Sequence, residues 1–357
     1  MVQVHTCQNG VRIVSEQIDH VRSVALGIFV NAGSRYELPE ENGITHFIEH
    51  MLFKGTATRS ARQIAEEFDR IGGELNAFTS KENTCYYAKV LDHHAELAVT
   101  ILADMFFNST FAEEELEKER QVVLEEILMS EDAPDDDVHE KLWGGVMYPN
   151  DALGRPILGT AATLKTFTAD AIRHYMDKHY GPESVVISIA GNISSQLMQT
   201  IEDLFGHYQP SPYAMAPVLT NPSFYPGGEI TKIRDTEQAH VAISYPAIGV
   251  KDPDMYSFIA LNNIIGGNMS SRLFQEVREE RGLAYSIFSY QSCYADVGAF
   301  TIYGSTSRQQ LAQLQHTIDA TLLDIVAGGV TEEELDNAKE QLKGSFVLGL
   351  EGTGGRV

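Results

Sequence analysis

The chain has 357 residues, of which 43% are apolar and 21% charged, as is ordinary for a globular protein. This length exceeds that of a typical single domain, so we expect two domains. With 26 basic and 50 acidic side chains the formal net charge is −24, which argues against a nucleic-acid-binding protein, since such proteins carry a basic surface.

The N-terminal part of the chain reads as a hairpin and a strand. Apolar residues alternate on both sides of Asn9-Gly10 over residues 3–15, and Asn-Gly is a strong hairpin turn signal. Residues 23–32 follow as an apolar segment rich in residues that favour strands. The first secondary structure of the chain is therefore predicted to be β.

The segment His46-Phe47-Ile48-Glu49-His50 reads H-x-x-E-H, a zinc-binding pattern with the spacing of H-E-x-x-H inverted. We expect a helix here, with Asn42 as its N-cap and Gly55 beyond its end. At 3.6 residues per turn the two histidines lie about 40° apart, and Glu49 lies about 60° to the other side of the first histidine. Three buried ionisable groups on one face favour a metal site over an ordinary core helix.

Four further elements follow in order. Ser60-Ala61-Arg62-Gln63 is a capping box that opens a predicted helix, and Gly72-Gly73 ends it. Residues 74–79 and 84–91 read as two strands joined by a polar turn. Residues 94–107 read as a helix.

A helix predicted over residues 113–129 supplies a third metal ligand. Its apolar stripe consists of three residues at helical spacing: Leu116, Val123 and Ile127. At 100° per residue, Glu119 and Glu126 fall within or beside that stripe, whereas Glu125 points away. Glu126 is therefore predicted to complete a His₂Glu ligand set, and Glu119 to orient one of the histidines from behind. The alternative is a solvated acidic helix, which suits Glu125 but not the other two.

The remainder of the first half reads as an acidic surface loop at residues 132–137, a capped helix at 168–180, a strand at 184–190 and a helix at 194–205. The proline-rich segment 210–226 shows no clear periodicity and is interpreted as an interdomain linker.

After that segment the chain repeats its first half. Two segments carry the alignment: residues 257–261 match 46–50, and residues 331–335 match 112–116. In this register Ala338 and Ser345 stand where the first half has its two core-facing glutamates. The second half keeps the apolar positions and loses every proposed metal group, so these groups share one purpose that is restricted to the first half.

Cysteine use and the N-terminus indicate the compartment. The three cysteines, Cys7, Cys85 and Cys293, form no C-x-x-C pair, which argues against a disulfide framework or a thiolate zinc site and fits a reducing compartment. Residues 1–10 show no signal or transit pattern, and no apolar run approaches the roughly 20 residues of a membrane span. We expect a cytoplasmic protein with neither a membrane nor a nucleic-acid partner.

Taken together, these motifs resemble the pitrilysin/insulinase family of zinc peptidases, and most of all its mitochondrial and bacterial processing-peptidase branch. The resemblance spans nearly the whole chain. Besides the metal pattern it rests on three segments: Leu75-Asn76-Ala77-Phe78-Thr79, residues 266–274 and residues 278–285. It implies that His46, His50 and Glu126 bind one zinc ion per chain and that Glu49 is the general base.

The resemblance also implies where a peptide substrate binds. Leu75 to Thr79 resembles the edge strand on which these enzymes lay substrate, with Asn76 beside the scissile bond. Arg278 and Tyr285 resemble a pair that reaches the substrate from the second domain. Without the resemblance, this pair would read as a helix-end salt bridge and a core tyrosine.

The expected fold is α+β, with two homologous α/β-sandwich modules, each an antiparallel-rich sheet with helices packed on it, facing each other across a cleft. The predicted boundaries are 1–209 for the zinc-binding module, 210–227 for the linker and 228–357 for the second module, which lacks metal ligands. In the repeat register Val357 corresponds to about residue 138, so we expect the second module to be incomplete at its C-terminus.

The function that follows is a zinc-dependent metalloendopeptidase that hydrolyses peptides or unfolded, presequence-like segments through a metal-activated water. The alternative is a non-catalytic structural or partner subunit of the same fold. We further expect a homodimer or pairing with a related subunit. Bound zinc without peptide cleavage would favour the alternative.

Overall fold

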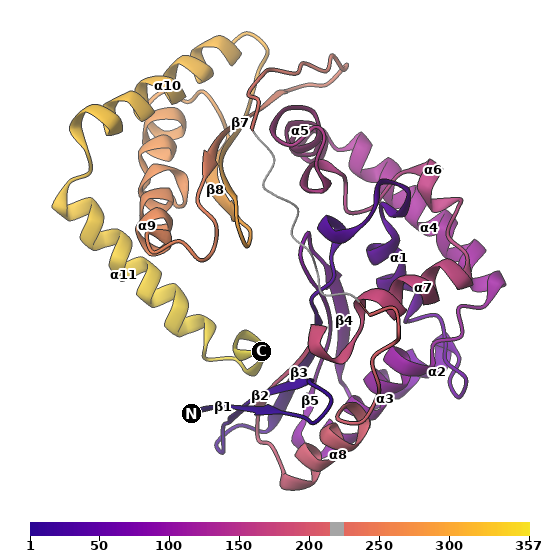
Figure 1. The fold of residues 1–357 in the computed structure, drawn as a ribbon. Coiled ribbons are helices and arrows are strands. Elements are labelled where there is room, and N and C mark those ends of the chain that lie inside the picture. The colour runs from indigo at the N-terminus through magenta and orange to yellow at the C-terminus, as the bar shows by residue number, and fades with distance from the viewer. Residues whose placement is uncertain (215–224) are drawn as a thin grey trace. The chain divides into compact units, whose positions relative to one another are not determined.

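The computed structural model describes residues 1–214 and 225–357, and the chain divides into two compact units (Figure 1). The first unit comprises Met1–Met129, Arg155–Thr220 and Gly349–Val357, and the second comprises Ser130–Gly154 and Asn221–Leu348. Most of the predicted linker falls on residues 215–224, which lie outside the described part of the chain.

This division differs from the predicted boundaries in two segments. Ser130–Gly154 belongs to the second unit, because its aromatic and aliphatic side chains form a buried cluster with Ala299. Gly349–Val357 belongs to the first unit, where Arg356 Nη1 pairs with Glu16 Oε2 at 2.8 Å. Both segments follow their apolar and ionic contacts rather than their position in the sequence.

The first unit is built on a six-stranded sheet in the order β1-β2-β6-β3-β5-β4. Its strands are β1 (Val2–Thr6), β2 (Arg12–Gln17), β3 (Ser23–Val30), β4 (Glu74–Thr79), β5 (Thr84–Leu91) and β6 (Val185–Gly191). The β2–β6 pair is parallel, and all other neighbouring pairs are antiparallel. The two edges of the sheet are therefore β1 and β4, and β3 lies inside it between β5 and β6.

Helices cover this sheet and share one apolar core with it. They are α1 (Ile44–Met51), α2 (Ala61–Arg70), α3 (Ala95–Asn108), α4 (Glu113–Asp132), α6 (Ala161–Leu164), α7 (Ala169–His179) and α8 (Ser195–Phe205). Alternate residues of β3, such as Leu26 and Ile28, are fully buried in that core together with Phe47 and Ile48 of α1. Burying apolar side chains at about 25 cal/mol per Å² is the main force that holds α1 on the sheet.

The predicted hairpin, strands and helices of this unit are confirmed. Gly10 has φ +101° in the hairpin turn, where a residue without Cβ is favoured. Ser60 accepts a hydrogen bond from the Gln63 backbone, and the Gln63 side chain accepts from the Ser60 backbone, so the capping box opens α2. Thr168 and Ser194 cap α7 and α8 through their hydroxyl groups, which accept from the backbone N–H groups of Ala171 and Leu197.

Asn42 is not the N-cap of α1, and that prediction was wrong. The N-cap is Gly43 at φ +94°. The carboxylate of Glu37, which is 4% exposed, accepts from the backbone N–H of Gly43 at 2.8 Å and of Thr45 at 2.9 Å. Asn42 donates to Glu37 as well, so it supports the cap instead of forming it. A charged acceptor six residues away satisfies the free N–H groups of the helix better than a local amide.

The predicted acidic loop at residues 132–137 was also wrong. The helix α4 continues to Asp132, and a new helix, α5 (Pro134–Leu142), begins two residues later with three aspartates in its first turn. Proline at the first helical position and negative charge near the N-terminus both favour a helix start. Asp137 is buried and pairs with Lys232 at 2.6 Å, so this stretch is not solvated loop.

The second unit contains a three-stranded antiparallel sheet in the order β7-β9-β8, with further helices. Its main elements are β7 (Ala239–Ala247), α9 (Met255–Gly266), the π-helical turn η7 (Phe274–Glu280), β8 (Ser286–Cys293), β9 (Gly298–Thr306), α10 (Leu311–Gly328) and α11 (Glu332–Gly349). α9 and α11 occupy the positions at which the repeat aligns with α1 and α4. Ala338, which aligns with Glu119, is buried at 2% exposure in a small apolar cluster with Ile264. No described helix is both long and apolar enough to cross a bilayer.

Candidate active site

Three side chains of the first unit come together with the chemistry of a metal site. The ligand atoms of His46, His50 and Glu126 all lie within 4.8 Å of one another. Nε2 of His46 is 3.8 Å and Nε2 of His50 is 3.7 Å from the same oxygen, Oε2 of Glu126. The two imidazole centroids are 4.5 Å apart. The histidines come from α1 and the glutamate from α4, as the sequence predicts.

The fold explains why these three groups point to one place. Phe47 and Ile48 are completely buried and fix the rotation of α1, so the histidines on either side of them are turned toward α4. Leu116 and Val123 are likewise completely buried and fix the rotation of α4. Apolar packing on both helices thus holds the polar face of one against the polar face of the other.

Burial keeps the first histidine neutral. His46 is 7% exposed, and this burial, together with the neighbouring His50, lowers its pKa to about 3. A neutral imidazole has a free lone pair and can act as a metal ligand near neutral pH.

The second histidine is oriented by a carboxylate behind it. Nδ1 of His50 lies 2.8 Å from Oε1 of Glu119, which is itself 4% exposed. Burial alone would lower the pKa of His50, but the bond to Glu119 and the nearby carboxylates outweigh burial and raise it. With the Nδ1 hydrogen donated to Glu119, Nε2 is left as the free nitrogen facing Glu126.

A cation missed by the sequence reasoning completes this arrangement. Nζ of Lys54 lies 2.5 Å from Oε2 of Glu119, on the side away from the histidine contact. These two contacts keep the pKa of Glu119 below its usual value in spite of burial. Lys54 stands four residues after His50, and that spacing on or just beyond a helix was an available signal.

Glu49 lies between the histidines in sequence and contacts the sheet. Its Oε2 accepts a hydrogen bond of 2.5 Å from the hydroxyl of Thr79, the last residue of β4. Burial raises the pKa of Glu49, with the Thr79 bond and His50 opposing that shift. The sequence placed Thr79 only in a substrate strand and gave no signal that it would reach this carboxylate.

The strand that carries Thr79 is an edge of the sheet. Leu75 and Ala77 pack against the helix-covered core, whereas Asn76 and Phe78 on the opposite side are exposed. The N–H of Ala77 donates to Oδ1 of Asn76 at 2.8 Å. An edge strand offers backbone groups that an extended peptide can pair with.

Arg278 and Tyr285 lie next to each other in the second unit. The Arg278 guanidinium carbon is 4.6 Å from the ring centroid of Tyr285 and 4.8 Å from that of Phe274. Tyr285, which directly precedes β8, is 78% exposed, so it is not a core tyrosine. A cation stacked on an aromatic ring is an attractive contact that holds both side chains in place.

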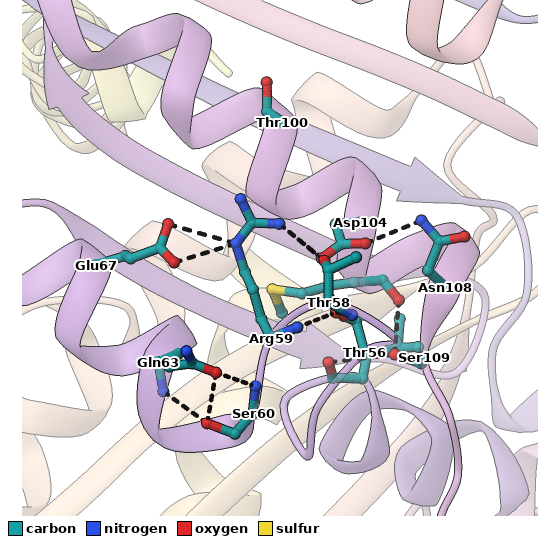
Figure 2. A network of polar contacts seen from close by, with 12 residues as sticks. Thr56, Thr58, Arg59, Ser60, Gln63, Glu67, Thr100, Asp104, Asn108 and Ser109 are labelled. Carbon is teal, nitrogen blue, oxygen red and sulfur yellow. Dashed lines mark hydrogen bonds and ion pairs between the residues drawn. The ribbon is translucent and has the colours of Figure 1, made fainter.

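A polar network holds the loop that connects α1 to α2 (Figure 2). Asp104 of α3 is 7% exposed and accepts from the hydroxyl groups of Thr56 and Thr58 at 2.7 and 2.9 Å. It also accepts from Arg59 at 2.7 Å and from Asn108 at 2.9 Å. This single carboxylate therefore anchors the loop that follows the histidine helix.

Comparison with known families places the chain by sequence. The family model described as "Insulinase (Peptidase family M16)" matches residues 12–161, and the one described as "Peptidase M16 inactive domain" matches residues 166–342. The first match contains His46, His50 and Glu126, and the second contains Arg278 and Tyr285.

Similar proteins carry related names. The chain is 54% identical over 357 residues to the "Uncharacterized zinc protease YmxG" of Bacillus subtilis. The matched region covers 100% of this chain and 86% of the relative. It is 44% identical to the "Uncharacterized zinc protease SCO5738" of Streptomyces coelicolor, over 98% of this chain and 77% of the relative.

Solved structures agree on the fold. The crystal structure of a protease from Helicobacter pylori superimposes with a TM-score of 0.91 at 22% identity, over 99% of this chain and 87% of that chain. A peptidase M16 inactive domain from Pseudomonas fluorescens gives a TM-score of 0.87 at 21% identity, over 97% and 84%. The mixed α/β architecture expected from the sequence is therefore confirmed.

Proposed function

From the premise that the chain belongs to the M16 (insulinase) peptidase family, we propose that it is a zinc-dependent metalloendopeptidase. The observation that carries this proposal is the convergence of His46, His50 and Glu126 within 4.8 Å, with Glu49 on the same helix as the histidines. The substrates proposed are peptides or unfolded segments of a polypeptide.

The donor set fits a zinc ion. Two ligand atoms on a tetrahedral zinc with bonds of about 2.1 Å are about 3.4 Å apart, close to the 3.7 and 3.8 Å between the histidine nitrogens and Glu126. Two neutral imidazoles and one carboxylate are a composition typical of catalytic zinc sites, which keep one position open. His46, His50 and Glu126 would hold the ion, and Glu119 with Lys54 would orient His50 from behind.

The chemistry then divides among residues of this chain. When bound, a zinc ion would lower the pKa of a coordinated water and polarise the substrate carbonyl. Glu49 would accept a proton from the attacking water on its carboxylate and donate it to the amine leaving group. Its burial favours this role, because a raised pKa brings the carboxylate nearer to the pH at which it works.

The second unit is proposed to contribute Arg278 and Tyr285. A guanidinium and a phenol are suitable hydrogen-bond donors for an oxygen that gains negative charge during attack on a peptide bond. Their mutual stacking and the exposure of Tyr285 support a role outside the core. Leu75 to Thr79 is proposed as the strand on which the peptide lies, which its edge position supports.

The test is peptide cleavage by the wild-type protein and by Glu49→Gln. The glutamine keeps the size of the side chain but cannot take up the proton. We expect the variant to bind as much zinc and to lower kcat by about 100-fold or more. Cleavage products are followed by mass spectrometry of a digested peptide library, and zinc by elemental analysis.

Two results would contradict the proposal. Cleavage by Glu49→Gln at the wild-type rate would remove Glu49 as the base. Stoichiometric zinc with no cleavage by the wild-type protein would favour the alternative, a non-catalytic subunit of the same fold. A processing role, a cytoplasmic location and pairing with an identical or related subunit stay predictions of the sequence.

A further inference from the structure

The one hydrogen-bond partner of the Glu49 carboxylate in the described part of the chain is the Thr79 hydroxyl. The O···O distance is 2.5 Å, which is typical of a charge-assisted bond between a hydroxyl and a carboxylate. The two residues are 30 positions apart and belong to different layers, α1 and β4. A bond of this kind joins the proposed base to the proposed peptide-binding edge.

We propose that Thr79 is a positioning residue that couples occupancy of the edge strand β4 to the orientation of Glu49. This inference rests on the proposed function, since it assigns Glu49 the role of base. Thr79 itself need not touch the reacting atoms. It acts by holding Oε2 of Glu49, which leaves Oε1 as the oxygen available for a proton.

The stiffness of threonine supports this role. A glutamate has three side-chain torsions and is poorly fixed without a partner, whereas the β-branched Thr79 has a restricted χ1. On its inner side Thr79 pairs with Thr84 of β5, which is fully buried and donates to the carbonyl of Ala32 at 2.9 Å. The position of the Thr79 hydroxyl is therefore fixed by the buried interior of the sheet.

The free edge of β4 is where peptide binding would be coupled to the orientation of Glu49. Because β4 is an edge, β5 is its one strand partner among the described residues, and the other side of its backbone is open to a peptide. A peptide that adds to the edge would further restrict the backbone at Thr79, the last residue of β4, and with it the carboxylate of Glu49. Binding energy gained along the strand would then appear as a higher kcat and not only as a lower KM.

A matched pair of variants isolates the hydroxyl. Thr79→Val keeps the shape and β-branching and removes the donor, whereas Thr79→Ser keeps the donor and loses the methyl group. We expect Thr79→Val to lower kcat by about 10–100-fold with little change in KM or zinc content, as is usual when a group that orients a functional residue is removed. Thr79→Ser is expected to restore most of that loss. Thr100→Val on the exposed side of α3 serves as the unrelated control.

The dependence of kcat on peptide length distinguishes the proposed coupling from a purely structural role of Thr79. Substrates shorter and longer than the six residues of β4 are compared around one cleaved bond. The wild-type protein and Thr79→Ser should gain kcat with the longer peptide, and Thr79→Val should lose this gain. A purely structural defect would lower kcat equally for both lengths.

A second readout does not need activity. In metal-free protein labelled with ¹³C at glutamate carboxyl groups, the Glu49 resonance is assigned by its absence from Glu49→Gln. It should shift in Thr79→Val and return toward its wild-type position in Thr79→Ser. An unchanged resonance in Thr79→Val would overturn the inference even if the protein cleaves nothing.

The kinetic outcomes separate the two proposals. If the wild-type protein cleaves peptides and Thr79→Val raises KM alone, Thr79 is a substrate contact and the coupling is wrong. Equal losses in Thr79→Val and Thr79→Ser would show that the hydroxyl is not responsible, which also overturns it. If the wild-type protein binds zinc and cleaves nothing, the proposed function fails instead, whatever the resonance shows.

Discussion

Glu125 and Glu126 are neighbours in the sequence, yet only Glu126 has its carboxylate among the histidine nitrogens, while Glu125 is exposed. The two side chains point in different directions because successive residues of α4 are rotated by about 100° around the helix axis. The same rotation places Glu119, two turns earlier, in contact with His50. At the scale of single residues, the candidate site is therefore a consequence of helical phase.

The positions of these glutamates around α4 predict how much zinc their variants bind. Glu126→Gln should lose most of the bound zinc, because a neutral amide is a poorer ligand than a carboxylate, whereas Glu125→Gln should keep it. Glu119→Gln should fall between them, with metal affinity lowered by about 10–100-fold. Elemental analysis of the purified variants measures this. Equal zinc in the Glu126 and Glu125 variants would refute Glu126 as a ligand.

The hydroxyl group of Tyr285 is the proposed donor to the oxyanion, and its removal should slow catalysis. Tyr285→Phe should keep fold and zinc and lower kcat by about 10²–10³-fold if the hydroxyl is a fully engaged donor to the developing oxyanion. Arg278→Ala should lower kcat/KM as well. Tyr256→Phe is the matched control, because Tyr256 belongs to the same unit and is 84% exposed. Full activity of Tyr285→Phe in a peptide-cleavage assay would rule out the donor role.

The element that matters most is α1, because it carries both histidines and the proposed base. Three unrelated features fix it: the Glu37 carboxylate at its N-terminus, apolar packing beneath it, and the anchored loop beyond its C-terminus. Asp104 holds the loop through three donors, the hydroxyl groups of Thr56 and Thr58 and the guanidinium of Arg59 (Figure 2). An eight-residue helix is marginal by itself, so its position is set by these surroundings.

Loss of the Asp104 anchor should destabilise the first unit. Asp104→Ala leaves the Arg59 guanidinium and two hydroxyl groups without their common acceptor, and we expect the free energy of unfolding to fall by about 3–5 kcal/mol. Glu67→Ala removes the other carboxylate that contacts Arg59, at 3.3 Å and closer to solvent, and should cost about 1 kcal/mol or less. Denaturant unfolding compares the two variants. Similar losses in both would mean that Asp104 is not the anchor.

At the scale of the whole molecule, a histidine that is partly withdrawn from water makes the stability of the fold depend on pH. His179 has a buried Nδ1 with no hydrogen-bond partner in the described residues, and its ring lies 4.3 Å from that of Tyr175. Burial, together with the neighbouring Lys178, lowers its pKa from 6.5 to about 4. The folded protein thus holds this histidine neutral in a range where the unfolded chain binds a proton.

The sign of the effect follows from linkage. The unfolded state binds more protons below pH 6.5, so stability is fully present above that pH and is lost as the pH falls toward 4, by at most about 1.4 kcal/mol per pH unit. His179→Phe should flatten this part of the stability curve relative to wild type. His174→Gln, at an exposed position on the same helix, should not. Parallel curves for wild type and His179→Phe between pH 6.5 and 4 would contradict the assignment.

The local chemistry of this protein could be predicted from its sequence. The H-x-x-E-H spacing, the phase of Glu119 and Glu126, and the capping box before α2 depend on helical periodicity and on contacts a few residues apart, which are properties of the chain itself. The repeat, in which Ala338 replaces Glu119, likewise needs only the sequence. The prediction failed at the cap of α1, where the carboxylate of Glu37 takes the place of the Asn42 side chain. It also failed at residues 132–137, where the proline and aspartates that open α5 were interpreted as a loop.

Contacts between distant residues were decided by the tertiary structure. The sequence places Thr79 and Glu49 thirty residues apart, and no periodicity relates a strand residue to a helix residue in another layer. The same is true of Lys54 with Glu119 and of Arg59 with Asp104. Such pairs form because apolar burial brings the layers together, and a polar side chain then lowers its cost of burial by bonding to whichever partner the packing places within reach.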